Sequence, residues 1–191
     1  MIEISESVIV TKVFSESECF KIIDSKDELH KSVEELQNNE KYNIPPDESN
    51  YTFGHINFPY WHVESSDQNE WFIKKLRECV TEINDKFFKF KNNGLWNMGM
   101  YEYSNHPDHN NSCSWHFDDM SRGKRLGCST TLHNAIEGGE FEIFNGEKVF
   151  IDLKVGEVVV FPTWLFHRVK PVLKGKRLSL ITWMKGDPID F

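Results

Sequence analysis

In the second half of the chain, short apolar stretches alternate with turn residues about every 8–12 residues, and this pattern restricts the fold most. Strands are expected over residues 95–103, 113–118, 125–133, 139–144, 147–153, 156–161, 167–172 and 177–184. The Asn145-Gly146 pair between EFEIF and EKVFI predicts a two-residue β-hairpin. Antiparallel strands of this number and length are typical of a jelly roll.

The first part of the chain carries helical signals instead. Three residue pairs have the spacing of a capping box: Ser15 with Glu18, Ser25 with Glu28, and Asp67 with Glu70. The longest expected helix follows Asp67, and its apolar face carries Phe72, Leu76, Cys79, Val80, Ile83 and Phe87. A short strand is expected over 8–14, and another over 51–58 within an aromatic-rich loop.

These patterns predict an α+β chain with a mostly β core. The length suits one domain over residues 1–191. A helix-rich support region at 1–92 is expected to pack against a β core at 93–186 that carries the chemistry.

Charge and cysteine content limit the partners and the compartment. The net charge of −8 gives no long-range attraction for nucleic acid or anionic membranes. The four cysteines are scattered, which suits reduced thiols better than a disulfide framework. The N-terminal MIEISESVIV lacks a basic region, and no apolar run reaches the roughly 18 residues of a membrane span. We therefore expect a soluble, cytoplasmic protein.

The segment WHFDD contains a candidate pair of metal ligands. Side chains two residues apart in a strand point to the same face, so His116 and Asp118 could bind one ion together. A second His-x-Asp pair, His106 and Asp108, contains Pro107 and lies among Ser and Asn, which indicates a turn. The alternation around His116 favours the first pair.

Two residues later in the chain, His167 and Arg177, complete the hypothesis of a metal site. His167, in the expected strand 167–172, could be a third ligand, and two His with one carboxylate are the ligands of non-haem Fe(II) oxygenases. Taken alone, His167 would be read as a core histidine bonded to the backbone. Arg177 begins the last expected strand on the same face as Ser179, where a buried guanidinium needs an anion. That anion could be a ligand or one of the chain's own carboxylates.

Together these segments resemble the 2-oxoglutarate- and Fe(II)-dependent dioxygenases, in particular their prolyl 4-hydroxylase-like branch. The resemblance covers about residues 95–186, through His116-x-Asp118, GGEFEIF, VGEVVVFPTWLFHRVKPV and GKRLSLITW. The N-terminal helices match only in general character, and the segment 104–114 is longer than in typical relatives.

The resemblance implies a double-stranded β-helix with Fe(II) bound by three catalytic ligands, His116, Asp118 and His167. It implies that Arg177 binds the far carboxylate of 2-oxoglutarate. The further cofactor-binding residues that it implies are Tyr103 or Tyr101, Thr131 and Ser179.

The implied reaction is the hydroxylation of a C–H bond by O₂, coupled to decarboxylation of 2-oxoglutarate to succinate, with ascorbate as a further candidate cofactor. The substrate is a peptide, with a peptidyl proline as the example, or a small molecule. Three alternatives stay open: a non-catalytic β-barrel or metal-binding module, a cupin-like metalloenzyme that needs no keto acid, and a zinc hydrolase.

Overall fold

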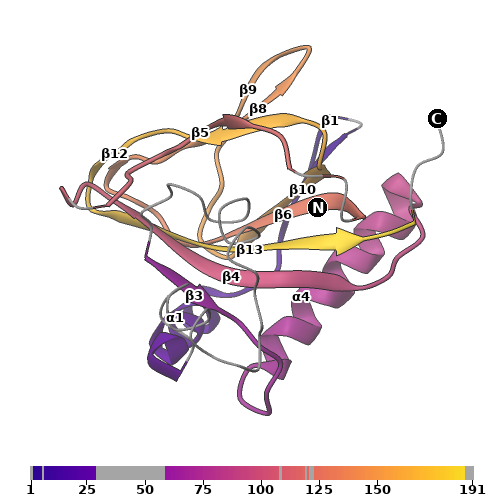
Figure 1. The fold of residues 1–191 in the computed structure, drawn as a ribbon, viewed down its shortest axis with the longest axis horizontal. Coiled ribbons are helices and arrows are strands. Elements are labelled where there is room, and N and C mark those ends of the chain that lie inside the picture. The colour runs from indigo at the N-terminus through magenta and orange to yellow at the C-terminus, as the bar shows by residue number, and fades with distance from the viewer. Residues whose placement is uncertain are drawn as a thin grey trace, which may run out of the picture.

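Two antiparallel sheets face each other in the computed structural model, which describes residues 2–5, 7–28, 59–107, 109–118, 120 and 123–187 (Figure 1). The larger sheet has the order β1 (Ile2–Ser5), β2 (Val8–Lys12), β10 (Glu157–Pro162), β6 (Lys124–His133), β13 (Lys176–Lys185), β4 (Leu95–Ser104) and β3 (Tyr60–His62). The smaller sheet has the order β5 (Cys113–His116), β11 (Phe166–Val169), β8 (Phe141–Asn145) and β9 (Glu147–Ile151). The short strands β7 (Glu137–Gly138) and β12 (Val172–Lys174) pair with each other.

The larger sheet is buried on both faces. Its outer face packs against the helices α1 (Glu16–Asp24) and α4 (Glu70–Ile83), as Figure 1 shows, through a cluster that includes Ile9, Phe14, Ile22, Phe72, Leu76, Met100, Leu126 and Leu180. Its inner face meets the smaller sheet through a second cluster that includes Val10, Tyr103, Phe141, Ile143, Val159, Phe161 and Val169. The predicted class, a mostly β core with helices packed against it, is confirmed.

The strand β13 shows how this alternation positions the polar residues. Leu178 and Leu180 belong to the helix-facing cluster. Arg177 and Ser179 alternate with them and therefore face the space between the sheets, where Arg177 lies directly opposite Tyr103 of β4. The sheet thus holds a cation inside the barrel.

The helix starts were predicted in part. Ser15 caps α1 in the expected box: the backbone N–H of Glu18 donates to Ser15 Oγ (3.2 Å), and the N–H of Ser15 donates to Glu18 Oε2 (2.7 Å). The expected box at Asp67 was wrong, because α4 begins after Asn69. The N–H groups of Asn69 and Glu70 donate instead to the Ser66 carbonyl (3.0 and 2.8 Å), which makes residues 66–69 a turn.

Other predictions for the first part of the chain had different outcomes. Ser25–Glu28 is a 3₁₀-helix, and π-helical residues Asn84–Phe88 continue α4. A helix with Leu29, Val33 and Leu36 at helical spacing was expected to follow Glu28; these residues, and the strand expected over 51–58, lie outside the described residues. The strands β1 and β3, which extend the larger sheet, were not predicted from the sequence.

Five predicted strands are shorter than expected: the one over 113–118 ends at His116, the one over 147–153 ends at Ile151, and three others have a clear local reason. Residues 167–172 divide into β11 and β12 because Pro171 has no N–H and that of Lys170 donates to the Glu140 carbonyl (2.9 Å). The strand predicted over 139–144 begins at Phe141, after Gly138 and Gly139 with positive φ angles of 77° and 76°. The strand β2 ends at Lys12 because the next two backbone N–H groups both donate to the Gly156 carbonyl.

All four cysteines are free. Among the described residues, none of the helices combines the length and the apolar character that crossing a membrane requires.

Candidate active site

The side chains of His116, Asp118 and His167 meet between the sheets. Each offers one ligand atom, and these atoms lie within 4.8 Å of one another. Because β5 and β11 are adjacent, His116 and His167 lie directly opposite each other, and their ring centroids are 4.2 Å apart. The distance from His167 Nε2 to Asp118 Oδ2 is 4.0 Å. Three donors at this spacing could hold one divalent cation.

Both imidazoles are held by the backbone in the same way. His116 Nδ1 donates to the carbonyl of Ser114 (2.8 Å), and His167 Nδ1 donates to the carbonyl of Leu165 (2.9 Å). A carbonyl only accepts, so each Nδ1 carries the hydrogen and each Nε2 keeps its lone pair for a metal. The smaller sheet therefore fixes the tautomer as well as the position.

Space beside the carboxylate comes from a glycine on the facing strand. The backbone N–H of Asp118 donates to the Thr163 carbonyl (3.0 Å), which fixes the chain at that point. A Cβ atom at Gly127 of β6 would lie 3.1 Å from Asp118 Oδ2 and 2.9 Å from the ring of Phe161. Only glycine leaves this space open.

The surroundings shift the pKa values of the two imidazoles in opposite directions. Burial lowers the pKa of His167 to about 4, and the charge of His116 acts in the same direction. Burial also lowers the pKa of His116, but hydrogen bonds to Cys113 and to the Ser114 carbonyl outweigh it and raise that pKa to about 9. A metal binds only the neutral imidazole, so a divalent cation at both Nε2 atoms would favour the neutral form of both rings.

A second polar group surrounds Arg177, whose side chain is only 3% exposed. Its Nη1 donates to Asn134 Oδ1 (3.3 Å) and its Nη2 donates to Thr131 Oγ1 (3.1 Å). Its Nε is buried without a hydrogen-bond partner. Burial lowers the pKa of Arg177 to about 10, although the charges of Tyr103 and Glu140 oppose this. Among the described residues Arg177 forms no ion pair, so its pairing with one of the chain's own carboxylates is not seen.

The other predicted cofactor-binding residues lie around this guanidinium. Ser179 Oγ is buried and has no hydrogen-bond partner. Tyr103 lies opposite Arg177, whereas Tyr101 lies opposite Ser179. Burial raises the pKa of both phenols, with a further contribution from Asp118 at Tyr101 and from Cys113 at Tyr103. Of the two phenols, Tyr103 is therefore the one paired in register with Arg177, whereas the ring of Tyr101 packs on that of Tyr60 (4.8 Å between centroids).

Sequence reasoning missed two residues of the site, Asn134 and Gly127. The signal for Gly127 was a glycine inside a buried strand pattern, which often marks a close approach by another group. The signal for Asn134 was absent, because it follows β6 in a loop. His106 of the rejected pair lies beyond β4 with its ring 4.7 Å from that of His109, and Asp108 lies outside the described residues.

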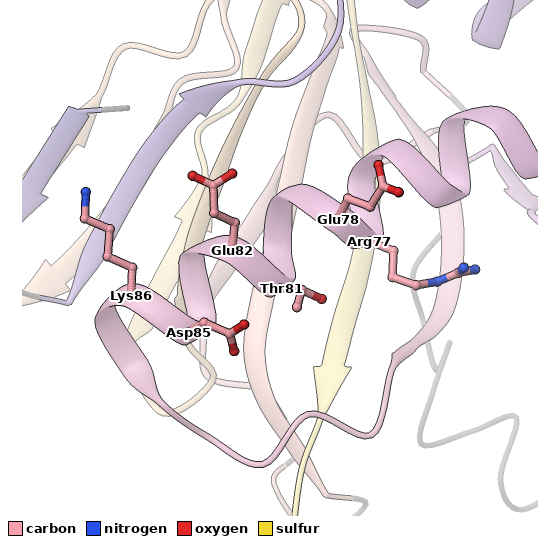
Figure 2. Close-up of a pocket in the computed structure, with 6 residues that line it drawn as sticks. All are labelled: Arg77, Glu78, Thr81, Glu82, Asp85 and Lys86. Atoms are coloured by element: carbon pink, nitrogen blue, oxygen red, sulfur yellow. The ribbon is translucent and has the colours of Figure 1, made fainter.

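A hollow on the surface has no part in this arrangement. Figure 2 shows that it follows the end of α4 and the π-helical residues after it, and that it is lined by Arg77, Glu78, Thr81, Glu82, Asp85 and Lys86. The helix covers the outer face of the larger sheet, so the hollow and the His-Asp-His group lie on opposite sides of that sheet (Figure 1).

Comparison with known proteins gives relatives of one kind. No family model matches the chain. A PKHD-type hydroxylase of Idiomarina loihiensis is 38% identical over 78 residues, which are 37% of this chain and 35% of the relative. The chain thus spans about a third of the length of the curated relatives that it matches.

Solved structures extend the comparison over nearly the whole fold. The viral collagen prolyl hydroxylase of Paramecium Bursaria Chlorella virus-1, in a 2-oxoglutarate complex, has a TM-score of 0.66 at 15% identity, over 95% of this chain and 97% of that one. A Trichoplax adhaerens prolyl hydroxylase, in complex with a hypoxia inducible factor peptide fragment, has a TM-score of 0.64 at 14% identity, over 95% and 84%. The relatives are thus PKHD-type hydroxylases and the structural neighbours prolyl 4-hydroxylase-like 2-oxoglutarate and Fe(II) oxygenases, as the sequence resemblance predicts.

Proposed function

We propose that this chain is a 2-oxoglutarate- and Fe(II)-dependent oxygenase that hydroxylates a C–H bond. One observation carries the proposal: the buried Arg177, which has no carboxylate partner among the residues that the structure describes, faces the same interior as a His-Asp-His group. A metal site alone would fit several chemistries. The unpaired cation adds a place for an anionic co-substrate.

In this proposal His116, Asp118 and His167 hold Fe(II), and Arg177 binds the far carboxylate of 2-oxoglutarate. Tyr103, Thr131 and Ser179 add hydroxyl groups around that carboxylate. The strand β6 passes both the metal ligands and the cation, because Gly127 lies beside Asp118 and Thr131 lies beside Arg177. These two positions are four residues, or about 13 Å, apart along the strand. That distance is long enough for an arginine side chain and a five-carbon acid placed end to end.

Bound Fe(II) would supply the O₂ chemistry that converts 2-oxoglutarate to succinate and CO₂ and oxidises the substrate. The protein supplies position and exclusion of water. The Nδ1 hydrogen bonds hold both imidazoles with Nε2 toward the ion, and Gly127 keeps the space beside Asp118 open. Ascorbate is a further candidate cofactor in this scheme.

We further propose a peptide substrate, for which a peptidyl proline is the first choice. Phe117 and Phe166 directly adjoin the ligands His116 and His167 in the chain, and their side chains are 53% and 44% exposed. Their rings lie 5.4 Å apart. Exposed aromatic pairs are typical of surfaces that bind apolar chain segments. The peptide complex of the Trichoplax adhaerens relative supports the same choice.

We also propose that residues 1–191 form a single domain and that the protein is cytoplasmic. Contacts between α1, α4 and the larger sheet support the first proposal. The free cysteines support the second, because reduced thiols persist in the cytosol. The net charge of −8 supports a substrate other than nucleic acid.

The test is succinate formation by the purified protein with Fe(II), 2-oxoglutarate and O₂. We expect turnover in the wild type and none in His116→Ala. Arg177→Ala should need far more 2-oxoglutarate, because the far carboxylate loses its partner. Metal binding without 2-oxoglutarate consumption would indicate a binding module, and turnover that is indifferent to 2-oxoglutarate would indicate a keto-acid-independent metalloenzyme. A peptide panel screened by mass for a gain of one oxygen tests the substrate.

A further inference from the structure

We propose that Asn134 is a positioning residue that holds Arg177 through a neutral oxygen and so keeps its charge available to the co-substrate. The inference rests on the proposed function, because it concerns the same anion site. Asn134 follows the last residue of β6 and accepts a hydrogen bond from Arg177 Nη1 at 3.3 Å.

The amide of Asn134 can point in only one direction. Its Nδ2 donates to the Leu153 carbonyl at 3.0 Å, so its Oδ1 faces the guanidinium. The other partner of Arg177 is the hydroxyl of Thr131 at 3.1 Å. Both acceptors are neutral, so they orient the guanidinium without cancelling its charge.

Glu140, whose charge acts on Arg177, has a lysine as its ion-pair partner. Its Oε2 lies 3.3 Å from Lys170 Nζ, although this oxygen accepts no hydrogen bond within the part of the chain that the structure describes. The Glu140 backbone carbonyl accepts from the Lys170 N–H (2.9 Å). Lys170 thus competes with Arg177 for Glu140. A guanidinium with only neutral contacts is the form that binds a carboxylate best.

Replacing the Asn134 amide by a carboxylate should remove the uncompensated charge of Arg177. An aspartate at 134 would place a carboxylate against Arg177, and the pair would be neutral before any co-substrate arrived. The far carboxylate of 2-oxoglutarate would then meet a guanidinium whose charge is already balanced. Because loss of a buried charge–charge contact is costly, Asn134→Asp should weaken 2-oxoglutarate binding roughly 100-fold. Asn134→Ala removes the hydrogen bond to the charged Arg177 and the one to the Leu153 carbonyl but adds no charge, and it should weaken binding about 10-fold.

The experiment measures 2-oxoglutarate binding to the Mn(II)-loaded protein by calorimetry, without turnover. Asn111→Asp is the matched control: it makes the same charge change in a part-buried asparagine whose Nδ2 donates to the Val172 carbonyl (3.4 Å) rather than contacting Arg177. We expect this control to bind 2-oxoglutarate like the wild type. The second probe is 2-oxobutyrate, which lacks the far carboxylate, and its binding should be equal in the wild type and Asn134→Asp.

The outcomes separate the two proposals. If the wild type binds no 2-oxoglutarate, both fall together. If the wild type binds it and Asn134→Asp binds it as well, or loses 2-oxobutyrate to the same extent, only the role of Asn134 is overturned. If Asn134→Asp does not fold, the variant Lys170→Met provides the alternative test of the inference. By releasing Glu140 toward Arg177 it should weaken 2-oxoglutarate binding about threefold, the scale of a half-exposed ion pair, and unchanged binding would overturn the inference.

Discussion

The charge buried at Arg177 should make the ligand-free protein less stable than an apolar residue would. The side chain is 3% exposed, and burial lowers its pKa from the ordinary arginine value to about 10. A shift of that size disfavours the charged form by about 3 kcal/mol. Arg177→Met removes this cost but leaves Thr131 and Asn134 without their donor, at roughly 1 kcal/mol each. The variant should therefore gain about 1 kcal/mol in free energy of unfolding.

The assay is urea unfolding of the metal-free proteins at pH 7, followed by circular dichroism. Leu178→Met is the matched control, because it puts the same side chain on the other face of β13 and should cost less than about 1.5 kcal/mol. Adding Mn(II) and 2-oxoglutarate should reverse the order of stability. At a hundredfold excess over the Kd, the wild type gains about 2.7 kcal/mol from the co-substrate, and Arg177→Met should gain none.

The opposite result would refute the reasoning. Breaking a buried ion pair by removing one partner costs about 3–5 kcal/mol. If ligand-free Arg177→Met is destabilised by that amount, then Arg177 is paired with a carboxylate of the chain itself. The cation would then be a structural group, and the case for an anionic co-substrate would lose its main support.

Two other changes test separate parts of the structure. Gly127→Ala should weaken Mn(II) binding about 10- to 100-fold, because the methyl group would press on the Asp118 carboxylate; calorimetry with unchanged affinity would contradict this geometry. Glu18→Gln should cost about 0.5–1 kcal/mol at pH 7, because the Lys75 ammonium lies 2.6 Å from Glu18 and lowers the pKa of that carboxyl. The contribution is present above the ordinary Glu pKa and is lost as pH falls through the lowered one, so urea unfolding should show the gap at pH 7 and not at pH 3.

The sequence was informative wherever side-chain direction follows from the local backbone. Alternation in WHFDD predicted His116 and Asp118 as a pair of ligands, and both are in the candidate group, although β5 ends at His116 and Asp118 follows it outside the strand. The same rule placed Arg177 and Ser179 inside the barrel, where they are. The strand positions were predicted well because apolar alternation and turn glycines are local signals.

Features that depend on pairing between distant segments could not be predicted. Tyr60 of β3 packs on Tyr101 with ring centroids 4.8 Å apart, and its ring fills the space above Gly99, where a Cβ would lie 2.2 Å from Tyr60 Cε2. Nothing in the sequence near residue 60 indicates this partner. Asn134 likewise meets Arg177 only because β6 and β13 are neighbours. The start of α4 was misplaced because a turn competed with the expected cap.

The pairing of β5 with β11 ties metal occupancy to the motion of the smaller sheet. Within the part of the chain that the structure describes, β5 is an edge strand whose sheet partner is β11. The ligands on either side of that pairing are about fifty residues apart in the chain, so the pairing is a late, non-local contact. An ion bound by ligands from both strands would cross-link them and would make separation of β5 from β11 rarer. Hydrogen exchange at the amides of β5 should therefore slow on metal loading, while that of the central strand β13 should stay the same.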